Sequence, residues 1–199
     1  MTLGLGLPMK SDNTTAVVVI PPQEAWAPIQ AIRTAHDPQV RRWMPHITML
    51  YPFRERVEFG TLEQEFTKAL AKVRPIELTF ARFGFFQHSP LSCTVWLAPE
   101  VTEAIDALQK KLWDVVPDCD DIRMYEHGFT PHLSVGKAGG PGAATELIRR
   151  VEANWQPLSF TVDCIHFVWR EDPPDDAFRT AVTVPLAGKK PGRPKTKKD

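Results

Sequence analysis

The sequence predicts an α+β protein made of two pseudo-twofold-related βαβαβ-type lobes, whose antiparallel sheets flank a central cleft. A pattern of proline, histidine, aliphatic, hydroxyl and apolar residues occurs twice, as PHITM at 45–49 and as PHLSV at 131–135. A longer segment also recurs, because PIELTFARFGFF at 75–86 aligns with PLSFTVDCIHFV at 157–168 with seven coinciding positions, which are the shared proline and six apolar residues. Both pairs of segments have the composition of β-strands, so the repeat is one of structure.

The first half is expected to run strand, helix, motif strand, helix and long strand. A β-branched run ended by two prolines predicts the first strand. Thr61, with Gln64 three residues later, matches a capping box, so the second helix is expected to begin there. The expected ranges, in order, are 16–20, 24–36, 46–51, 61–73 and 75–87.

The second half is expected to repeat this order. Its elements are a strand at 92–98, a helix at 101–115, the second motif strand, a helix around 147–155, a strand at 158–169 and a final strand at 179–186. In the two long strands, the apolar positions change from even to odd numbers after Phe80 and after Val162. A β-bulge or twist is therefore expected at one common point of both copies.

Composition and charge define the expected boundaries. Residues 1–15 are expected to be a flexible lead-in, residues 16–187 the bilobal domain, and residues 188–199 a disordered basic tail. The chain has no net charge, but 189–199 hold six Lys or Arg and one Asp, so this segment is +5 and the rest is −5. No apolar run approaches the ~20 residues of a membrane span, so no membrane partner is expected.

Cysteine usage favours a reducing compartment. Cys93, Cys119 and Cys164 form no CxxC pair, and an odd count argues against a disulfide framework. We therefore expect an intracellular protein, cytoplasmic or nuclear.

The two motifs carry the candidate chemistry. In an extended strand, a spacing of two residues places His46 with Thr48 and His132 with Ser134 on one face. Two imidazoles suit in-line displacement at phosphorus, because one can remove a proton from the incoming oxygen while the other protonates the leaving oxygen. The hydroxyls can donate hydrogen bonds to phosphate oxygens. This chemistry requires no cofactor and no metal.

Other residues have both functional and structural interpretations. Tyr51, Tyr125 and Phe129 flank the motifs and could stack on a base, as could Phe53, although aromatic residues beside strands usually belong to the core. Charged and imidazole side chains near the motifs could contact phosphate or border the cleft, but solvated or structural roles are the simpler interpretation. They are Arg54, Lys137, His36, His88, His127 and His166. A zinc site of His46, His132 and a carboxylate has no supporting HxxxH or Cys-rich spacing.

The extended motifs PHITMLYPF and FTPHLSVGK resemble the two HxT/S signatures of the two-histidine (2H) phosphoesterase superfamily, in its 2′-5′ RNA ligase-like branch. The resemblance covers about residues 16–186, with Ser134 in place of the more usual threonine. It implies a bilobal fold, catalytic His46 and His132, and phosphate-binding Thr48 and Ser134.

The resemblance also implies an activity, namely metal-independent opening of 2′,3′-cyclic phosphates on RNA ends or on small nucleotides, including ADP-ribose cyclic phosphate. Two alternatives remain open, which are 2′-5′ RNA ligation at the same site and a nucleotide- or RNA-binding module without turnover. We expect a monomer. The residues do not decide which histidine is the acid, and our working assignment is His46 as acid and His132 as base.

The basic tail resembles an AT-hook through its Gly-Arg-Pro core, although Pro191 stands where an arginine is usual. A nuclear-localisation signal and a merely solubilising segment are the alternatives. In each case we expect no more than a weak contact of the tail with nucleic acid.

Overall fold

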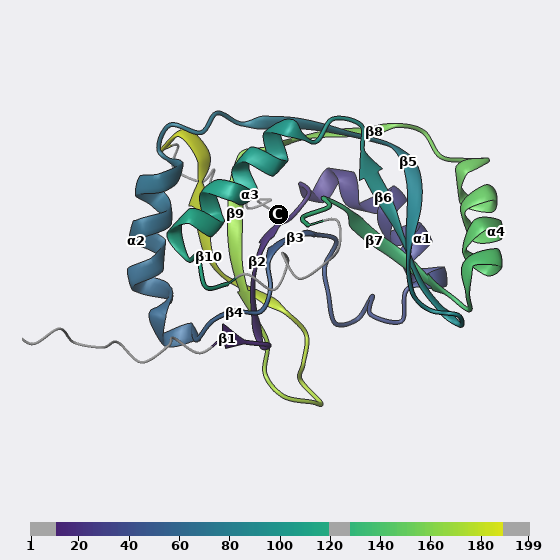
Figure 1. The fold of residues 1–199 in the computed structure, drawn as a ribbon, viewed down its shortest axis with the longest axis horizontal. Coiled ribbons are helices and arrows are strands. Elements are labelled where there is room, and N and C mark those ends of the chain that lie inside the picture. Colours follow the sequence, from purple (N-terminus) through teal and green to yellow (C-terminus); the bar gives the residue numbers. More distant parts are fainter. Residues whose placement is uncertain (1–10, 120–127, 189–199) are drawn as a thin grey trace, which may run out of the picture.

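A computed structural model describes residues 11–119 and 128–188. Its main feature is an eight-stranded sheet with the order β10-β9-β2-β3-β7-β6-β5-β8, in which all neighbours pair antiparallel (Figure 1). The two motif strands, β3 (Ile47–Leu50) and β7 (Leu133–Ala138), lie beside each other at the centre of this order. The sheet therefore divides into two four-stranded halves that meet where the motifs lie.

The remaining elements extend outward from this centre. The other strands of the sheet are β2 (Thr15–Val19), β5 (Ile76–Ser89), β6 (Ser92–Pro99), β8 (Leu158–Val162), β9 (Cys164–Trp169) and β10 (Arg179–Pro185). The short strands β1 (Ser11–Asp12) and β4 (Phe53–Arg54) form a separate pair. The helices are α1 (Trp26–His36), α2 (Phe59–Leu70), α3 (Glu103–Val115) and α4 (Pro141–Glu152), with 3-10 turns at Gln23–Ala25, Arg56–Glu58 and Leu186–Gly188.

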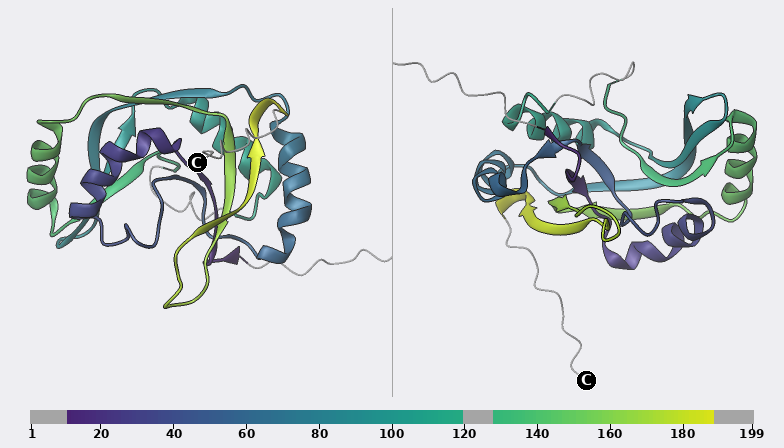
Figure 2. Two further views of the ribbon diagram at one scale, coloured as in Figure 1. Left: turned by 180° about the vertical axis from the view of Figure 1, so that it is seen from behind. Right: turned by 90° about the horizontal axis from the view of Figure 1, so that it is seen from below.

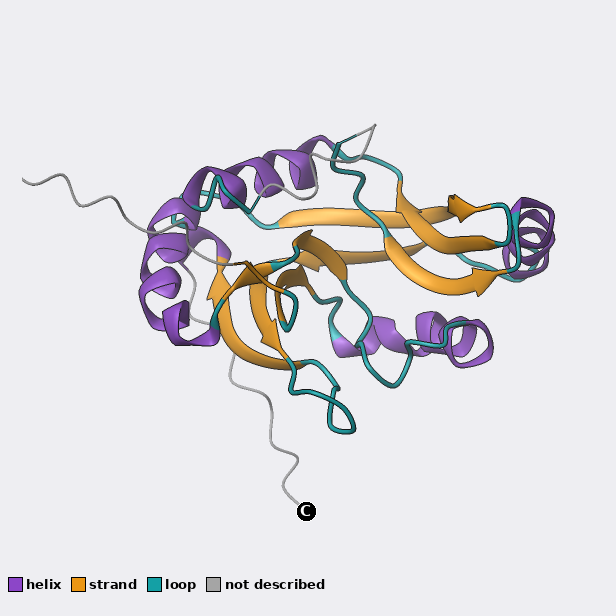
Figure 3. Ribbon diagram, turned by 60° about the horizontal axis from the view of Figure 1, so that its bottom comes forward, coloured by secondary structure: helices purple, strands orange, loops and turns teal. Residues whose placement is uncertain are grey.

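The helices exchange places between the two halves of the sheet. Helix α1 precedes β3 in the sequence but packs on β7, and α3 precedes β7 but contacts β3. Helix α2 packs on α3 and β10, while α4 covers β5, β6 and β7. Figures 2 and 3 show the result, with α2 and α3 at one end of the molecule and α1 and α4 at the other. The expected α+β, pseudo-twofold architecture is confirmed, but its halves interleave along the sequence.

Of the two long strands, β5 stays within one half of the sheet, whereas its second copy, β8 followed by β9, crosses from one half to the other. Strand β5 pairs with β8 over Ile76–Phe80 and with β6 beyond that point, and its register shifts between Phe80 and Arg82. The second copy breaks at Asp163, which separates β8 from β9, and β9 then pairs with β2 and β10. The irregularity expected after Phe80 and after Val162 is confirmed at equivalent positions.

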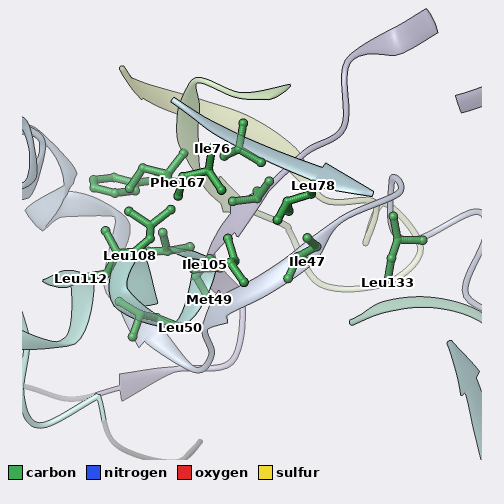
Figure 4. Close-up of a cluster of buried hydrophobic side chains, with 14 of the residues drawn as sticks. Ile47, Met49, Leu50, Ile76, Leu78, Ile105, Leu108, Leu112, Leu133 and Phe167 are labelled. Atoms are coloured by element: carbon green, nitrogen blue, oxygen red, sulfur yellow. The ribbon is translucent and has the colours of Figure 1, made fainter. Parts of the chain in front are cut away.

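A continuous apolar core packs against the buried side of β3, the first motif strand. Ile47, Met49 and Leu50 are fully buried, and they belong to the same cluster as Ile105, Leu108 and Leu112 of α3 (Figure 4). Burying each of these side chains contributes on the order of 1.5–3 kcal/mol. Such packing holds the motif strand rigidly, which a site that must place reacting groups requires.

Several boundaries differ from expectation. The capping-box prediction is wrong, because α2 begins at Phe59, directly after a 3-10 turn, and Thr61 lies inside its first turn. Phe59 extends the buried stripe of Leu62, Phe66 and Leu70 by one turn, so packing decides the start. Helix α4 spans Pro141–Glu152, so it begins before the expected 147 and ends before 155. Strand β5 runs to Ser89, two residues beyond its expected end, and therefore includes His88.

The lead-in is shorter than expected, because Ser11–Asp12 forms β1 and Thr15 begins β2. The basic segment 189–199, together with Tyr125 and His127, lies outside the described residues. Within the described part of the chain, no helix is both long and apolar enough to cross a bilayer.

Candidate functional site

The register at the centre of the sheet brings the two motifs together. Ile47 pairs with Leu133, and both are buried on one face. Continuing this antiparallel register by one residue in each direction places His46 opposite Ser134 and Thr48 opposite His132. Each histidine therefore has the hydroxyl of the other motif as its cross-strand neighbour.

A cavity of about 240 Å³ opens on this face. Its wall includes His46, Thr48 and Ser134, together with residues of α1 and of the loop that follows α1. His132 does not line the cavity, and its half-buried ring contacts Phe86 and Trp96.

Both imidazoles are held in the same way. His46 Nδ1 lies 2.7 Å from the carbonyl oxygen of Met44, and His132 Nδ1 lies 2.7 Å from that of Thr130. A carbonyl oxygen can only accept, so each Nδ1 carries the hydrogen. The Nε2 of each neutral ring then keeps a free lone pair. The two groups are therefore equivalent in tautomer as well as in sequence.

Aromatic side chains set the ring positions. Trp43 stacks on His46 with centroids 4.4 Å apart, and Trp43 itself stacks on Phe178 at 3.5 Å. His132 meets the edge of Phe86 at 4.9 Å and a tilted Trp96 at 5.9 Å. These contacts limit the movement of both rings. Sequence inspection missed Trp43, Phe86 and Trp96 because it treated only the residues next to the motifs as candidates.

Burial keeps the histidines neutral. It lowers the pKa of His46 to about 4, and the positive charge of Arg33 and repulsion from His132 act in the same direction. Burial also lowers the pKa of His132 from its usual value. Both rings are therefore uncharged at neutral pH in the free protein.

Arg33 of α1 is a buried charge that acts on His46. Its side chain is only 2% exposed and bonds Asp37 at 2.9 Å, Gln30 at 3.0 Å and the carbonyl oxygen of Trp43 at 2.8 Å. Arg33 and Asp37 both line the cavity. An arginine on the apolar face of a helix with an acid four residues later was a usable signal in the sequence.

Helix α1 can approach this site because β7 carries a glycine. A Cβ at Gly136 would lie 2.9 Å from Cβ of His36, the last residue of α1. The small residue therefore sets how closely Arg33 and Asp37 approach the motif strands.

Of the remaining candidate residues, some line the cavity and the others lie elsewhere. Tyr51 and Lys137 line the cavity, and the Tyr51 hydroxyl donates to the carbonyl of Asn13 at 3.1 Å. Phe129 packs against the core and is not part of the cavity wall, and Phe53 is fully buried. Arg54 is buried and forms an ion pair with Asp118.

The other described histidines have structural partners or positions. His166 bonds the Thr183 hydroxyl at 3.0 Å, His88 bonds Thr94 at 2.8 Å, and His36 ends α1. Burial lowers the pKa of His166 to about 4 as well, so such a shift follows burial and does not by itself mark a site. In the described ranges, no group of three or more His, Cys, Asp or Glu residues is arranged to hold a metal ion.

A family model and a related protein each match most of this chain. The family model described as "2'-5' RNA ligase superfamily" matches residues 21–174. The Geobacillus kaustophilus protein named "Putative phosphoesterase GK0864" is 23% identical over 156 residues, which are 77% of this chain and 86% of that protein.

Solved structures share the fold. TT0787 of Thermus thermophilus superposes with a TM-score of 0.59 at 16% identity, covering 88% of this chain and 99% of its own. E. coli LigT with 3′-AMP gives 0.56 at 15%, covering 89% and 99%. Kluyveromyces marxianus Usb1 gives 0.51 at 12%, covering 88% and 99%.

Proposed function

Because the chain belongs to the 2′-5′ RNA ligase superfamily, whose members act on phosphodiester bonds, we propose that it is a metal-independent phosphodiesterase that hydrolyses 2′,3′-cyclic phosphates. RNA ends and small nucleotides, including ADP-ribose cyclic phosphate, are the candidate substrates. The observation that carries the proposal is the matched pair of imidazoles, each with Nδ1 bonded to the backbone and Nε2 left for proton transfer.

The proposed reaction assigns one role to each of these side chains. The base, assigned to His132, takes a proton from water, and the water oxygen attacks phosphorus. The bond between phosphorus and one ribose oxygen breaks, and the acid, assigned to His46, protonates that oxygen. Thr48 and Ser134 donate hydrogen bonds to the non-bridging oxygens as negative charge builds up on them.

The structural relatives support a nucleotide ligand. LigT has been crystallised with 3′-AMP, with phosphate, with ATP and with NADP+. A nucleoside 3′-phosphate is one of the two monoesters that opening of a 2′,3′-cyclic phosphate can release. Ligation to a 2′-5′ bond would be the same ring opening, with a 5′-hydroxyl in place of water as the attacking group and the 3′ oxygen as the leaving group.

Incubation with nucleoside 2′,3′-cyclic phosphates in excess chelator tests the proposal. Phosphorus NMR should show the cyclic resonance replaced by that of a single 2′- or 3′-monoester, because imidazoles and hydroxyls supply what a metal would otherwise provide. Loss of turnover in chelator, with recovery on adding zinc or magnesium, would contradict the metal-independent mechanism. A tight complex without turnover would favour the binding module instead.

The pKa shifts predict an acidic optimum. The reaction needs one imidazole protonated and the other neutral, and burial lowers the pKa of both below 6.5 in the free enzyme. The singly protonated form therefore decreases as pH rises, and kcat/KM should fall about tenfold per pH unit above ~6.5. A profile of kcat/KM from pH 4 to 9 measures this, and a plateau that extends to pH 8 would contradict it.

A further inference from the structure

The cavity wall includes two residues that are equivalent by position but opposite in chemistry. Tyr51 lies five residues after His46, and Lys137 lies five residues after His132. Both line the cavity. The pseudo-twofold repeat that matches the histidines and hydroxyls thus breaks at this position, with an aromatic group on one side and a cation on the other.

Matched β-bulges turn these two residues toward the cavity. The pairing of β2 with β3 shifts between Val17 and Val18, which leaves Met49 as the extra residue. The pairing of β6 with β7 shifts between Val95 and Trp96, which leaves Val135 as the extra residue.

Without a bulge, strand alternation would send a side chain five residues after the histidine to the opposite face. One inserted residue reverses that parity. The bulge occurs at the same step, three residues after the histidine, in both motifs. It therefore supplies a specific reason why Tyr51 and Lys137 face the same space as the reacting groups.

Lys137 is an uncompensated charge at the cavity wall. Its Nζ donates to Oγ1 of Thr94 at 2.6 Å. In the two described ranges, no carboxylate lies within 4 Å of this ammonium, whereas the other cation of the cavity, Arg33, is paired with Asp37. The contact with Thr94, a buried residue of β6, holds the ammonium beside the cavity and leaves two of its three donor hydrogens for a ligand.

We propose that Lys137 binds a second phosphate of the substrate, the 5′-phosphate of the nucleotide whose cyclic phosphate lies at the histidine pair. The inference rests on the proposed function and adds substrate selectivity to it. Lys137 is three residues from Ser134 along the strand, which is roughly 10 Å at most at ~3.3 Å per residue. The flexible side chain of a lysine can cover part of this distance.

The proposal predicts that the enzyme prefers substrates that carry a 5′-phosphate. The ratio of kcat/KM with and without that phosphate measures the preference. Wild-type kcat/KM should be about 10- to 100-fold higher for a 5′-phosphorylated nucleoside 2′,3′-cyclic phosphate than for the same nucleoside without the 5′-phosphate, as one charge-assisted hydrogen bond allows. Lys137→Met should reduce this ratio to near one. Lys137→Arg should restore most of it, because the cation returns.

Lys110→Met is the matched control, since Lys110 is an exposed lysine of α3 that pairs only with Asp114 in the described structure. It should leave the ratio at the wild-type value. A wild-type ratio near one, or a Lys137→Met ratio equal to wild type, would overturn the assignment of Lys137.

A binding measurement distinguishes the failure of this inference from the failure of the proposed function. Calorimetry should show that a nucleoside 3′,5′-bisphosphate binds more tightly than the 3′-monophosphate, and that Lys137→Met removes the difference. This comparison needs no turnover. If cyclic phosphates are not hydrolysed but the difference in affinity depends on Lys137, the proposed reaction fails and the phosphate subsite stands.

Discussion

Replacing His46 or His132 with alanine is expected to lower kcat/KM for a cyclic phosphate by ~10²–10⁴-fold, the contribution of one proton-transfer group. Each ring keeps its Nδ1 bonded to a backbone carbonyl, so its loss removes a reacting Nε2 without removing a structural link between elements. Steady-state kinetics at the pH optimum measures the loss, and thermal unfolding establishes that the variants remain folded.

Three further variants test whether this loss is specific to the two histidines. Thr48→Ala and Ser134→Ala should lose less, because a single neutral donor stabilises the charge on phosphate only in part. His166→Ala removes another half-buried imidazole, one that bonds Thr183 outside the cavity, and should keep kcat/KM near the wild-type value. Near-normal turnover by either His46→Ala or His132→Ala would show that the two-histidine mechanism is wrong.

Arg33→Met is expected to reduce the free energy of unfolding by about 3–5 kcal/mol. The change leaves the Asp37 carboxylate, which is 7% exposed, without its partner, and an unpaired buried charge costs about this much. It also removes the donor to the carbonyl of Trp43, the residue that stacks on His46. Chemical denaturation of wild type and variant gives the difference.

The double variant Arg33→Met/Asp37→Leu should recover most of that stability, since it removes both charges together. Lys110→Met breaks the exposed pair with Asp114 and should change stability by no more than about 0.5 kcal/mol. If Arg33→Met costs less than about 1 kcal/mol, the buried pair does not hold α1 and its following loop in place.

Local patterns in the sequence were enough for the parts of the fold that depend on near neighbours. Strand alternation placed His46 with Thr48 and His132 with Ser134 on one face, and the change of parity after Phe80 predicted the observed register shift. Both follow from the two-residue period of a strand. The capping-box prediction failed because burial of Phe59 outweighed the weaker preference of Thr61 for a helix start.

Features that depend on long-range packing could not be predicted in the same way. The approach of α1 to β7 requires Gly136 to meet His36, two residues 100 positions apart with no shared local pattern. The stack of Trp43 on His46 depends on how a loop folds back. The bulges at Met49 and Val135 become visible only when the register with the neighbouring strands is known.

The central claim, that the two histidines share one reaction as acid and base, is tested most directly with a substrate that needs no acid. A p-nitrophenyl phosphodiester releases a stable anion, so the variant that lacks the acid should hydrolyse it at nearly the wild-type rate. The variant that lacks the base should stay slow on both this substrate and the cyclic phosphate. The account predicts that one of His46→Ala and His132→Ala is rescued in this way and the other is not. Equal losses by both variants on both substrates would contradict it.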